Sequence, residues 1–192
     1  MVRVLVVDES AERADTLRDG LARAGHEVVA TLSSPLELLR AVERVQPDVI
    51  VIDTESPSRD VLEHLVFVSQ HTPRPVVMFS ADSAPETIRA ATRAGVSAYV
   101  VDGLDKDRIQ SIVEAAVARF EQYQALRIEL ADANLKLTER KVVERAKGLL
   151  MKSRSLDEEA AYAALRKMAM DRKLKLVEVA QRVIDAADLL GA

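Results

Sequence analysis

Nearly continuous apolar runs alternate with helix-period segments through the first half of the chain. The runs are rich in Val, Ile and Leu and cover residues 2–7, 28–32, 48–53, 75–79 and 98–101. Between them, apolar residues recur every three to four positions, which predicts helices. Strands that are apolar throughout need cover on both faces, so the pattern predicts a parallel sheet with helices on either side. We therefore expect an α/β domain over residues 1–120, a five-stranded parallel (βα)5 fold.

A long helix is expected to follow this domain. Neither Gly nor Pro occurs between Gly103 and Gly148, so a helix that begins near Asp105 has no reason to end before Lys152. Its length of about 45 residues, near 70 Å, exceeds that of an ordinary globular helix, so it needs a partner.

The partner of this helix is expected to be a second copy of itself. Apolar and small residues recur near a seven-residue spacing over 120–140, at Phe120, Tyr123, Leu126, Leu130, Ala133 and Leu137. This spacing predicts a short coiled-coil connector in a homodimer, and Asn134 would set the register if it occupied an a position. The alternative is a helix that packs back on its own N-terminal domain.

Three helix-period patterns occupy residues 141–192, and they predict an all-α domain of three small helices. The first ends near Ser153, and the third begins at Leu176 after a polar break. Ser155 followed by Glu158 predicts a capping box that starts the middle helix. The shared core of Ala, Leu and Val is small for about fifty residues, so it should depend on the rest of the chain.

Composition narrows the possible functions. The absence of Cys excludes disulfides, thiolate zinc sites and cysteine nucleophiles, and the three His lack metal-ligand spacing, so we expect them at the surface or in loops. No run is long enough to span a membrane and no signal peptide is evident, so a soluble cytoplasmic protein is expected. The chain has a net charge of −4, but its C-terminal part is basic, because residues 140–192 carry twelve Lys or Arg against eight Asp or Glu.

Several spaced residues at this basic end carry a family resemblance. Arg145-Ala-Lys-Gly-Leu-Leu-Met-Lys152, with Glu158-Glu-Ala-Ala-Tyr162 and Leu165-Arg166 behind it, resembles the ANTAR domain, the RNA-binding module of transcription antiterminators. The resemblance implies that Ala146, Lys147 and Gly148 contact RNA, and we expect further phosphate contacts from the basic side chains of Arg145, Lys152, Arg166 and Lys173. Small residues would admit an RNA loop, and the cations would meet phosphates. Their alternative role is solubility, or for Arg166 a contact with Glu159 or Asp171.

Carboxylates follow the predicted strands of the N-terminal domain. Asp8 and Glu9 end the first strand, Asp53 the third, and Ser80 the fourth. The carboxyl ends of parallel strands meet at one sheet edge, where three carboxylates would repel one another unless a cation such as Mg²⁺ shared them. Alternatively, these acids only cap the helices that follow. We expect an acidic pocket in which Mg²⁺ is possible and no cofactor is required.

The same residues resemble the response-regulator receiver domain. The resemblance implies that Asp53 is the phosphoacceptor, and that Ser80 and Tyr99 take the switch positions. The family has a Lys just after the fifth strand, where this sequence has Asp102, with Lys106 a few residues on. A carboxylate there would repel a phosphoryl group, which argues against control by phosphorylation.

The sequence around Asp53 narrows the resemblance further. Ile52-Asp-Thr-Glu-Ser-Pro57, Pro73-Arg-Pro75 and Ala94-Gly-Val-Ser-Ala-Tyr99 are similar to the nitrate/nitrite-responsive antiterminators of assimilatory nitrate reductase operons. In that group a nitrate-binding sensor protein sequesters the regulator, and ligand-induced release replaces phosphotransfer. We therefore expect a dimer that binds a leader RNA with two hairpins and prevents termination.

Three other functions compete with this one. A phosphorylation-activated response regulator could bind RNA or DNA, although a DNA-binding helix-turn-helix usually has a tight turn with Gly, which the 153–155 break lacks. A protein-only adaptor would use its C-terminal helices on another protein. An enzyme is not expected, because no nucleophile, base and orienting group converge by motif.

Overall fold

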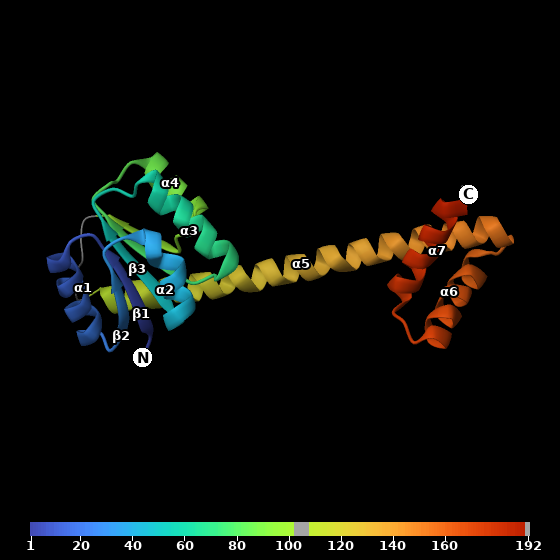
Figure 1. Cartoon of the computed structure of the whole chain (residues 1–192), viewed down its shortest axis with the longest axis horizontal. Helices are drawn as coiled ribbons and strands as arrows, with labels where there is room; N and C mark the ends of the chain where they lie inside the picture. The colour runs from blue at the N-terminus through green and yellow to red at the C-terminus, as the bar shows by residue number, and fades with distance from the viewer. Residues whose placement is uncertain (102–107, 191–192) are drawn as a thin grey trace. The chain divides into compact units, whose positions relative to one another are not determined.

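The computed structural model describes residues 1–101 and 108–190 of the chain (Figure 1). The chain divides into two compact units, Met1–Gln124 and Ala125–Ala192. Among the described residues, no helix is long and apolar enough to cross a bilayer.

The first unit is built on a five-stranded parallel sheet. Its strands run in the order β2-β1-β3-β4-β5, and every neighbouring pair is parallel. The strands are β1 (Arg3–Asp8), β2 (Glu27–Leu32), β3 (Val49–Thr54), β4 (Val76–Ser80) and β5 (Ala98–Val101). The expected (βα)5 fold is confirmed, because strands that are apolar on both sides are covered on both faces.

Helices cover the sheet in two layers (Figure 1). They are α1 (Ala11–Arg23), α2 (Leu38–Val45) after a 3₁₀ turn η1 (Pro35–Glu37), α3 (Arg59–His71), α4 (Pro85–Arg93) and the start of α5 (Ile109–Arg154). On one face, α2, α3 and α4 pack on alternate strand residues such as Leu5, Ile50 and Met78. On the other, α1 and α5 pack on the intervening residues, among them Val6 and Phe79.

Local sequence signals set most helix ends. Ser10 and Ser58 accept hydrogen bonds from backbone N–H groups at the starts of α1 and α3, as N-cap residues do. The loop after α1 turns at Gly25, whose φ of 81° favours glycine. His26 follows in this loop but is only 9% exposed. The histidines were expected at the surface or in loops, and His26 lies in a loop without being at the surface.

Helix α5 is one uninterrupted helix of 46 residues, as the absence of Gly and Pro predicts. Its first turns bury Ile109, Val113 and Ala116 against the sheet. Residues 125–138 are exposed along its middle. The helix therefore begins as part of one core and ends as part of another.

The second unit joins the end of α5 to α6 (Glu158–Arg172) and α7 (Leu176–Leu190). The three helices share one small core, as expected, formed by residues such as Ala146, Leu150, Leu165, Ala180 and Ile184. Small side chains allow these helices to pack closely.

The predicted capping box at the start of α6 is wrong. Asp157, and not Ser155, is the N-cap, and its Oδ1 accepts a hydrogen bond from the Ala160 N–H at 2.7 Å. Ser155 has a left-handed φ of 52° in the connection. The Glu158 carboxylate binds the ammonium group of Lys147 at 2.7 Å, so an opposite charge attracts it away from the helix start.

Candidate functional site

Asp8 and Asp53 lie next to each other at the carboxyl end of the sheet. They are register partners on the adjacent strands β1 and β3. Asp8 is 2% exposed and Asp53 is half-buried. Burial raises the pKa of Asp53, the charge of Asp8 raises it further, and Arg13 opposes both effects. The structure thus brings together two of the three expected carboxylates.

Arg13 supplies the positive charge of this pocket. Its Nη2 lies 3.1 Å from Asp8 Oδ1, and its Nη1 lies 3.7 Å from Glu55 Oε1. The first turn of α1 sets its position, since the Arg13 N–H donates to the Ser10 cap. Sequence reasoning missed Arg13. The available signal was its place five residues after Asp8, at the start of the helix that rises from this sheet edge.

The residues present do not fit a divalent cation in this arrangement. Glu9 is exposed, and in the described parts of the chain no group of three or more His, Asp or Glu could hold a metal ion. Asp8 Oδ1 already accepts hydrogen bonds from the Ser10 N–H and from Arg13. The second oxygen, Oδ2, is buried and has no partner among the described residues, but the adjacent guanidinium would repel a cation. Asp102 and Lys106, which bear on phosphorylation, lie outside the described residues.

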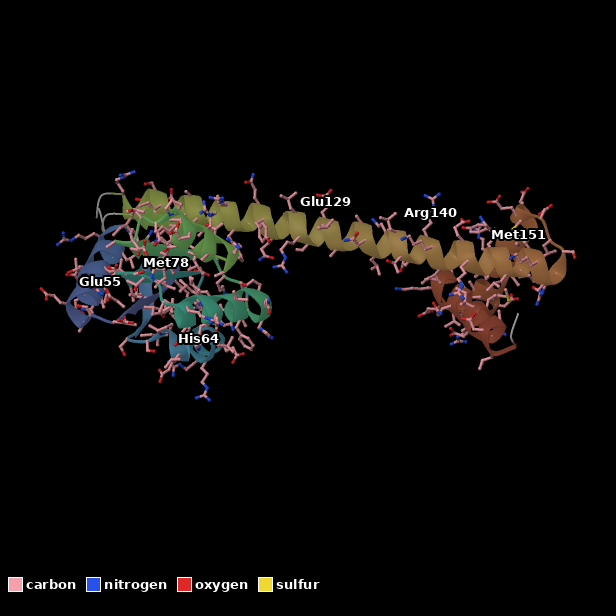
Figure 2. The ribbon with its side chains drawn as sticks, turned by 90° about the horizontal axis from the view of Figure 1, so that it is seen from above. Glu55, His64, Met78, Glu129, Arg140 and Met151 are labelled. Atoms are coloured by element: carbon pink, nitrogen blue, oxygen red, sulfur yellow. The ribbon has the colours of Figure 1, made fainter. Side chains whose placement is uncertain are left out.

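The predicted switch residues hold the loops at this edge together. Ser80 is 3% exposed, and its hydroxyl donates to the Glu55 carbonyl at 3.0 Å while accepting the Asp82 N–H at 3.1 Å. Tyr99 donates its hydroxyl hydrogen to the Asp82 carbonyl at 2.8 Å. Figure 2 shows Glu55 at this end of the unit. Both switch hydroxyls are therefore already bonded to neighbouring loops.

Asp82 links the loops after β3 and β4. Its carboxylate accepts hydrogen bonds from the Ala84 N–H, from the Ser56 hydroxyl at 2.8 Å and from the Thr87 hydroxyl. These bonds, led by that of Ala84, lower the pKa of Asp82. The ionised carboxylate ties the segment after Asp53 to the start of α4.

The seven residues expected to bind RNA fall into two groups. Four have exposed side chains: Arg145, Lys152, Arg166 and Lys173. Ala146 is fully buried in the three-helix core, Lys147 is 8% exposed, and Gly148 is half-buried. The structure therefore gives an RNA-accessible surface to only part of the predicted set.

Lys147 has a structural environment that differs from its expected role. Its ammonium lies 2.6 Å from Glu144 and 2.7 Å from Glu158. These carboxylates, Glu144 foremost, raise the pKa of Lys147, and Lys147 in turn lowers that of Glu158. Its charge is balanced within the unit, so Lys147 fastens the start of α6 to α5 and does not present a free cation to phosphate.

Gly148 lies on the outer side of α5. A Cβ built there would meet no other atom within 4 Å. At 100° per residue, Arg145 and Lys152 fall on the same face, opposite the buried Ala146. Arg145 also pairs with Asp188 at 3.0 Å, whereas the contact of Arg166 with Glu159 or Asp171 does not occur among the described ion pairs. An open backbone flanked by cations is suited to close approach of an anionic polymer.

Comparison with known proteins assigns a family to each unit. Residues 4–114 match the response regulator receiver domain, and residues 131–184 match the ANTAR domain. The transcriptional regulatory protein PdtaR of Mycobacterium tuberculosis is 31% identical over 183 residues, which cover 95% of this chain and 89% of that protein.

Several other relatives and solved structures match only part of the chain. A protein-glutamate methylesterase/protein-glutamine glutaminase of Xanthomonas oryzae pv. oryzae is 39% identical over 109 residues, which are 56% of this chain but 30% of that enzyme. The receiver domain of a modulated diguanylate cyclase from Desulfovibrio desulfuricans superposes with a TM-score of 0.57, 21% identity and coverage of 64% of this chain and 98% of that one. The receiver domain of NarL from Mycobacterium tuberculosis superposes with a TM-score of 0.55 and 23% identity. This match covers 61% of this chain and 96% of that one. At these identities the two structures show the fold alone.

Proposed function

The chain belongs to the response regulators that join a receiver domain to an RNA-binding ANTAR domain, and from this premise we propose how it acts. It binds a leader RNA with two hairpins and holds that RNA in a form that cannot complete a terminator, so transcription continues. Such a protein acts on nascent transcripts in the cytoplasm.

The observation that carries this proposal is the exposed basic surface within the ANTAR match. Lys152, Arg166 and Lys173 are exposed and form no ion pair in the described part of the chain, and the open backbone of Gly148 lies beside Lys152 on α5. Cations of this kind neutralise phosphates and release counterions, which gives affinity that falls steeply with salt.

We extend the proposal to the signal that controls binding. A nitrate/nitrite-binding sensor protein sequesters the regulator and releases it when ligand binds, so genes of nitrate assimilation are switched without phosphotransfer. Two contacts favour this control. Arg13 offsets part of the negative charge of the pocket where a metal would support phosphorylation, and the Ser80 hydroxyl is bonded to the Glu55 carbonyl. No cofactor is required, and Mg²⁺ would have to displace the Arg13 guanidinium from Asp8.

The proposed RNA-binding form is a homodimer joined through α5. Large apolar side chains are exposed along the middle of this helix, among them Leu126 at 64%, Leu130 at 63% and Leu137 at 57%. Exposed leucines at coiled-coil spacing lower the free energy when a second helix covers them.

The experiment measures binding of purified protein to a two-hairpin leader RNA at stated salt, with and without the sensor protein. We expect Lys152→Ala and Arg166→Ala to weaken binding several-fold each and to reduce its salt dependence. Arg18→Ala, which removes an exposed cation of the receiver unit, is the matched control. Asp53→Ala should bind like the wild type, and the sensor should suppress both.

The second candidate is a regulator activated by phosphorylation, because Asp53 stands at the carboxyl end of β3, half-buried beside Asp8. This candidate predicts that RNA binding needs both Asp53 and a phosphodonor such as acetyl phosphate.

A preference for duplex DNA over hairpin RNA would contradict the proposal that the protein binds RNA.

A further inference from the structure

A pocket of about 380 Å³ lies within the second unit, between α5, α6 and the start of α7. Its volume is in the range of sites that hold small organic groups. Tyr162, Lys136, Arg140 and Lys175 line it, with aliphatic side chains between them. None of these four belongs to the set that the sequence assigned to RNA.

Tyr162 gives this pocket an aromatic surface. It is the sole aromatic residue in the sequence of the second unit and is 45% exposed. Its hydroxyl has no hydrogen-bond partner among the described residues. An aromatic ring that is open to solvent inside a pocket can stack on one face of a nucleobase, which is how unpaired RNA bases are commonly held.

The charges around Tyr162 favour a ligand with phosphates. Lys136 is paired with Asp132 at 2.7 Å, and the pocket carboxylate of Glu144 is paired with Lys147. Arg140 and Lys175 form no ion pair within the described residues. Arg140 lines the pocket, and Figure 2 shows its side chain extending from α5 into solvent. Two cations beside one aromatic ring match a base with its flanking phosphates.

The pocket also contains an acceptor. Glu139 is half-buried on its wall, and a carboxylate there can accept a hydrogen bond from an amino or imino group on the edge of a stacked base. A purely phosphate-binding groove would gain nothing from this acid.

From these contacts we propose that the pocket takes one unpaired base of the hairpin loop, stacked on Tyr162, with the adjacent phosphates on Lys175 and Arg140. The inference rests on the proposed function and names how the RNA is recognised. One aromatic ring holds one base, so the rest of the hairpin is bound through shape and phosphates.

The test uses full-length protein and a hairpin that the wild type selects from a pool with a fixed stem and a randomised loop. Affinities are measured by fluorescence anisotropy. Tyr162→Ala should weaken binding roughly ten- to one-hundred-fold, the range that loss of one base–aromatic stack produces, whereas Tyr162→Phe, which keeps the ring, should retain most of it. Met170→Ala is the control, because Met170 is 71% exposed on the same helix outside the pocket.

The RNA is varied in parallel, so that no result depends on a protein variant alone. Loop bases are removed one at a time as abasic sites. At one position the abasic RNA should lose as much affinity as Tyr162→Ala causes, and the two changes combined should lose little more, which is the coupling expected of direct partners.

The outcomes separate the two proposals. If the wild type selects no hairpin, the proposed function is wrong. If the wild type binds a hairpin and Tyr162→Ala binds it equally well, only the proposal of a base pocket is wrong. The same holds if the loss of binding free energy at every abasic site is additive with the loss caused by Tyr162→Ala. Free nucleoside monophosphates should compete weakly; a monophosphate that binds more tightly than the hairpin would overturn the RNA loop as the natural occupant.

Discussion

At the scale of single residues, Arg13 changes what the acidic pocket can bind. Its guanidinium contacts Asp8 at 3.1 Å and lowers the pKa of Asp53 against the effect of burial. We predict that Arg13→Ala leaves two adjacent carboxylates uncompensated and raises the affinity for Mg²⁺ by roughly tenfold or more. Isothermal titration with MgCl₂ measures this change. Arg18→Ala, which removes the exposed partner of Asp15, should leave Mg²⁺ binding unaltered, and equal affinities in all three proteins would contradict the role of Arg13.

Gly148 allows stability and binding to be separated. Because a Cβ at this position would meet nothing within 4 Å, Gly148→Ala should stabilise the helix by about 0.5–1 kcal/mol. If RNA approaches the backbone here, the same methyl group should weaken RNA binding several-fold. Thermal unfolding and anisotropy titrations give the two quantities. A variant that is stabilised and binds RNA normally would show that the open backbone is not part of the interface.

The burial of His26 predicts that the stability of the receiver unit depends on pH. Its burial, with a smaller effect from the N-terminal amino group, lowers its pKa, so the folded state favours the neutral ring. A depressed folded-state pKa means that stability is intact above the unfolded value of about 6.5 and falls as the pH drops below it. We predict that His26→Gln flattens the dependence of the unfolding midpoint between about pH 6.5 and 5. His71→Gln, which changes an exposed histidine, should retain the wild-type slope.

At the scale of elements, α5 carries an apolar stripe made of Tyr123, Leu126, Leu130, Ala133 and Leu137. These residues are spaced by three and four positions, and the large ones are at least 57% exposed. Two heptad registers are compatible with this stripe. If Tyr123 occupies an a position, the stripe fills the a and d positions and Asn134 falls at e. If Tyr123 occupies a d position, Arg127 and Asn134 both fall at a positions. The first register covers more apolar area, so we expect it in the dimer.

This stripe leads to a test of the dimer. Leu130→Glu places like charges opposite each other in the seam and should shift the protein towards monomer, with a rise of at least roughly tenfold in the dimer dissociation constant. Ile128→Glu is the matched control, because Ile128 is 69% exposed on the opposite side of the helix. Sedimentation equilibrium measures both. A wild type that is monomeric at high concentration would rule out the proposed coiled coil.

The elements themselves were largely predictable from sequence, and the exceptions have physical reasons. Unbroken apolar runs such as 49–52 identified the strands, and the gap without Gly or Pro identified α5. The cap of α6 was predicted wrongly because Ser155 and Asp157 both have capping side chains, and only the position of Lys147 on another helix shows why Glu158 is diverted. A pair eleven residues apart cannot be read from a local pattern.

At the scale of the whole molecule, two RNA-binding units in one dimer should act together. When both hairpins lie on one transcript, the second binding event occurs at the effective concentration set by the RNA between them, and affinity can rise roughly 10²- to 10⁴-fold. We predict that Leu130→Glu binds a single hairpin as well as the wild type but loses most of this gain on the two-hairpin RNA. Titration of both RNAs with both proteins measures the gain directly. Equal losses on one and two hairpins would point to damage within the ANTAR domain.

The candidate sites were less predictable than the fold. Asp8 and Asp53 could be placed together because parallel strands end at one edge, yet the Arg13 guanidinium that contacts Asp8 was not foreseen. Lys147 lies in the run that resembles the ANTAR domain, yet its ammonium is held by two carboxylates. In both cases the charged residues could be identified from the sequence. Whether each charge is free to bind a ligand depends on the side chains that surround it in the folded structure.

The guanidinium in the acidic pocket also has a consequence for our proposal that a partner protein, and not phosphorylation, controls the regulator. A metal ion can be depleted, exchanged or removed by a chelator, and a phosphoryl group turns over with the supply of donors and phosphatases. A cation carried on the chain is present in every copy from the moment of folding. Under the proposed control by a partner protein, such a receiver domain would not follow the supply of phosphodonors or of magnesium, and the number of active regulators would be set by synthesis, degradation and capture by other macromolecules.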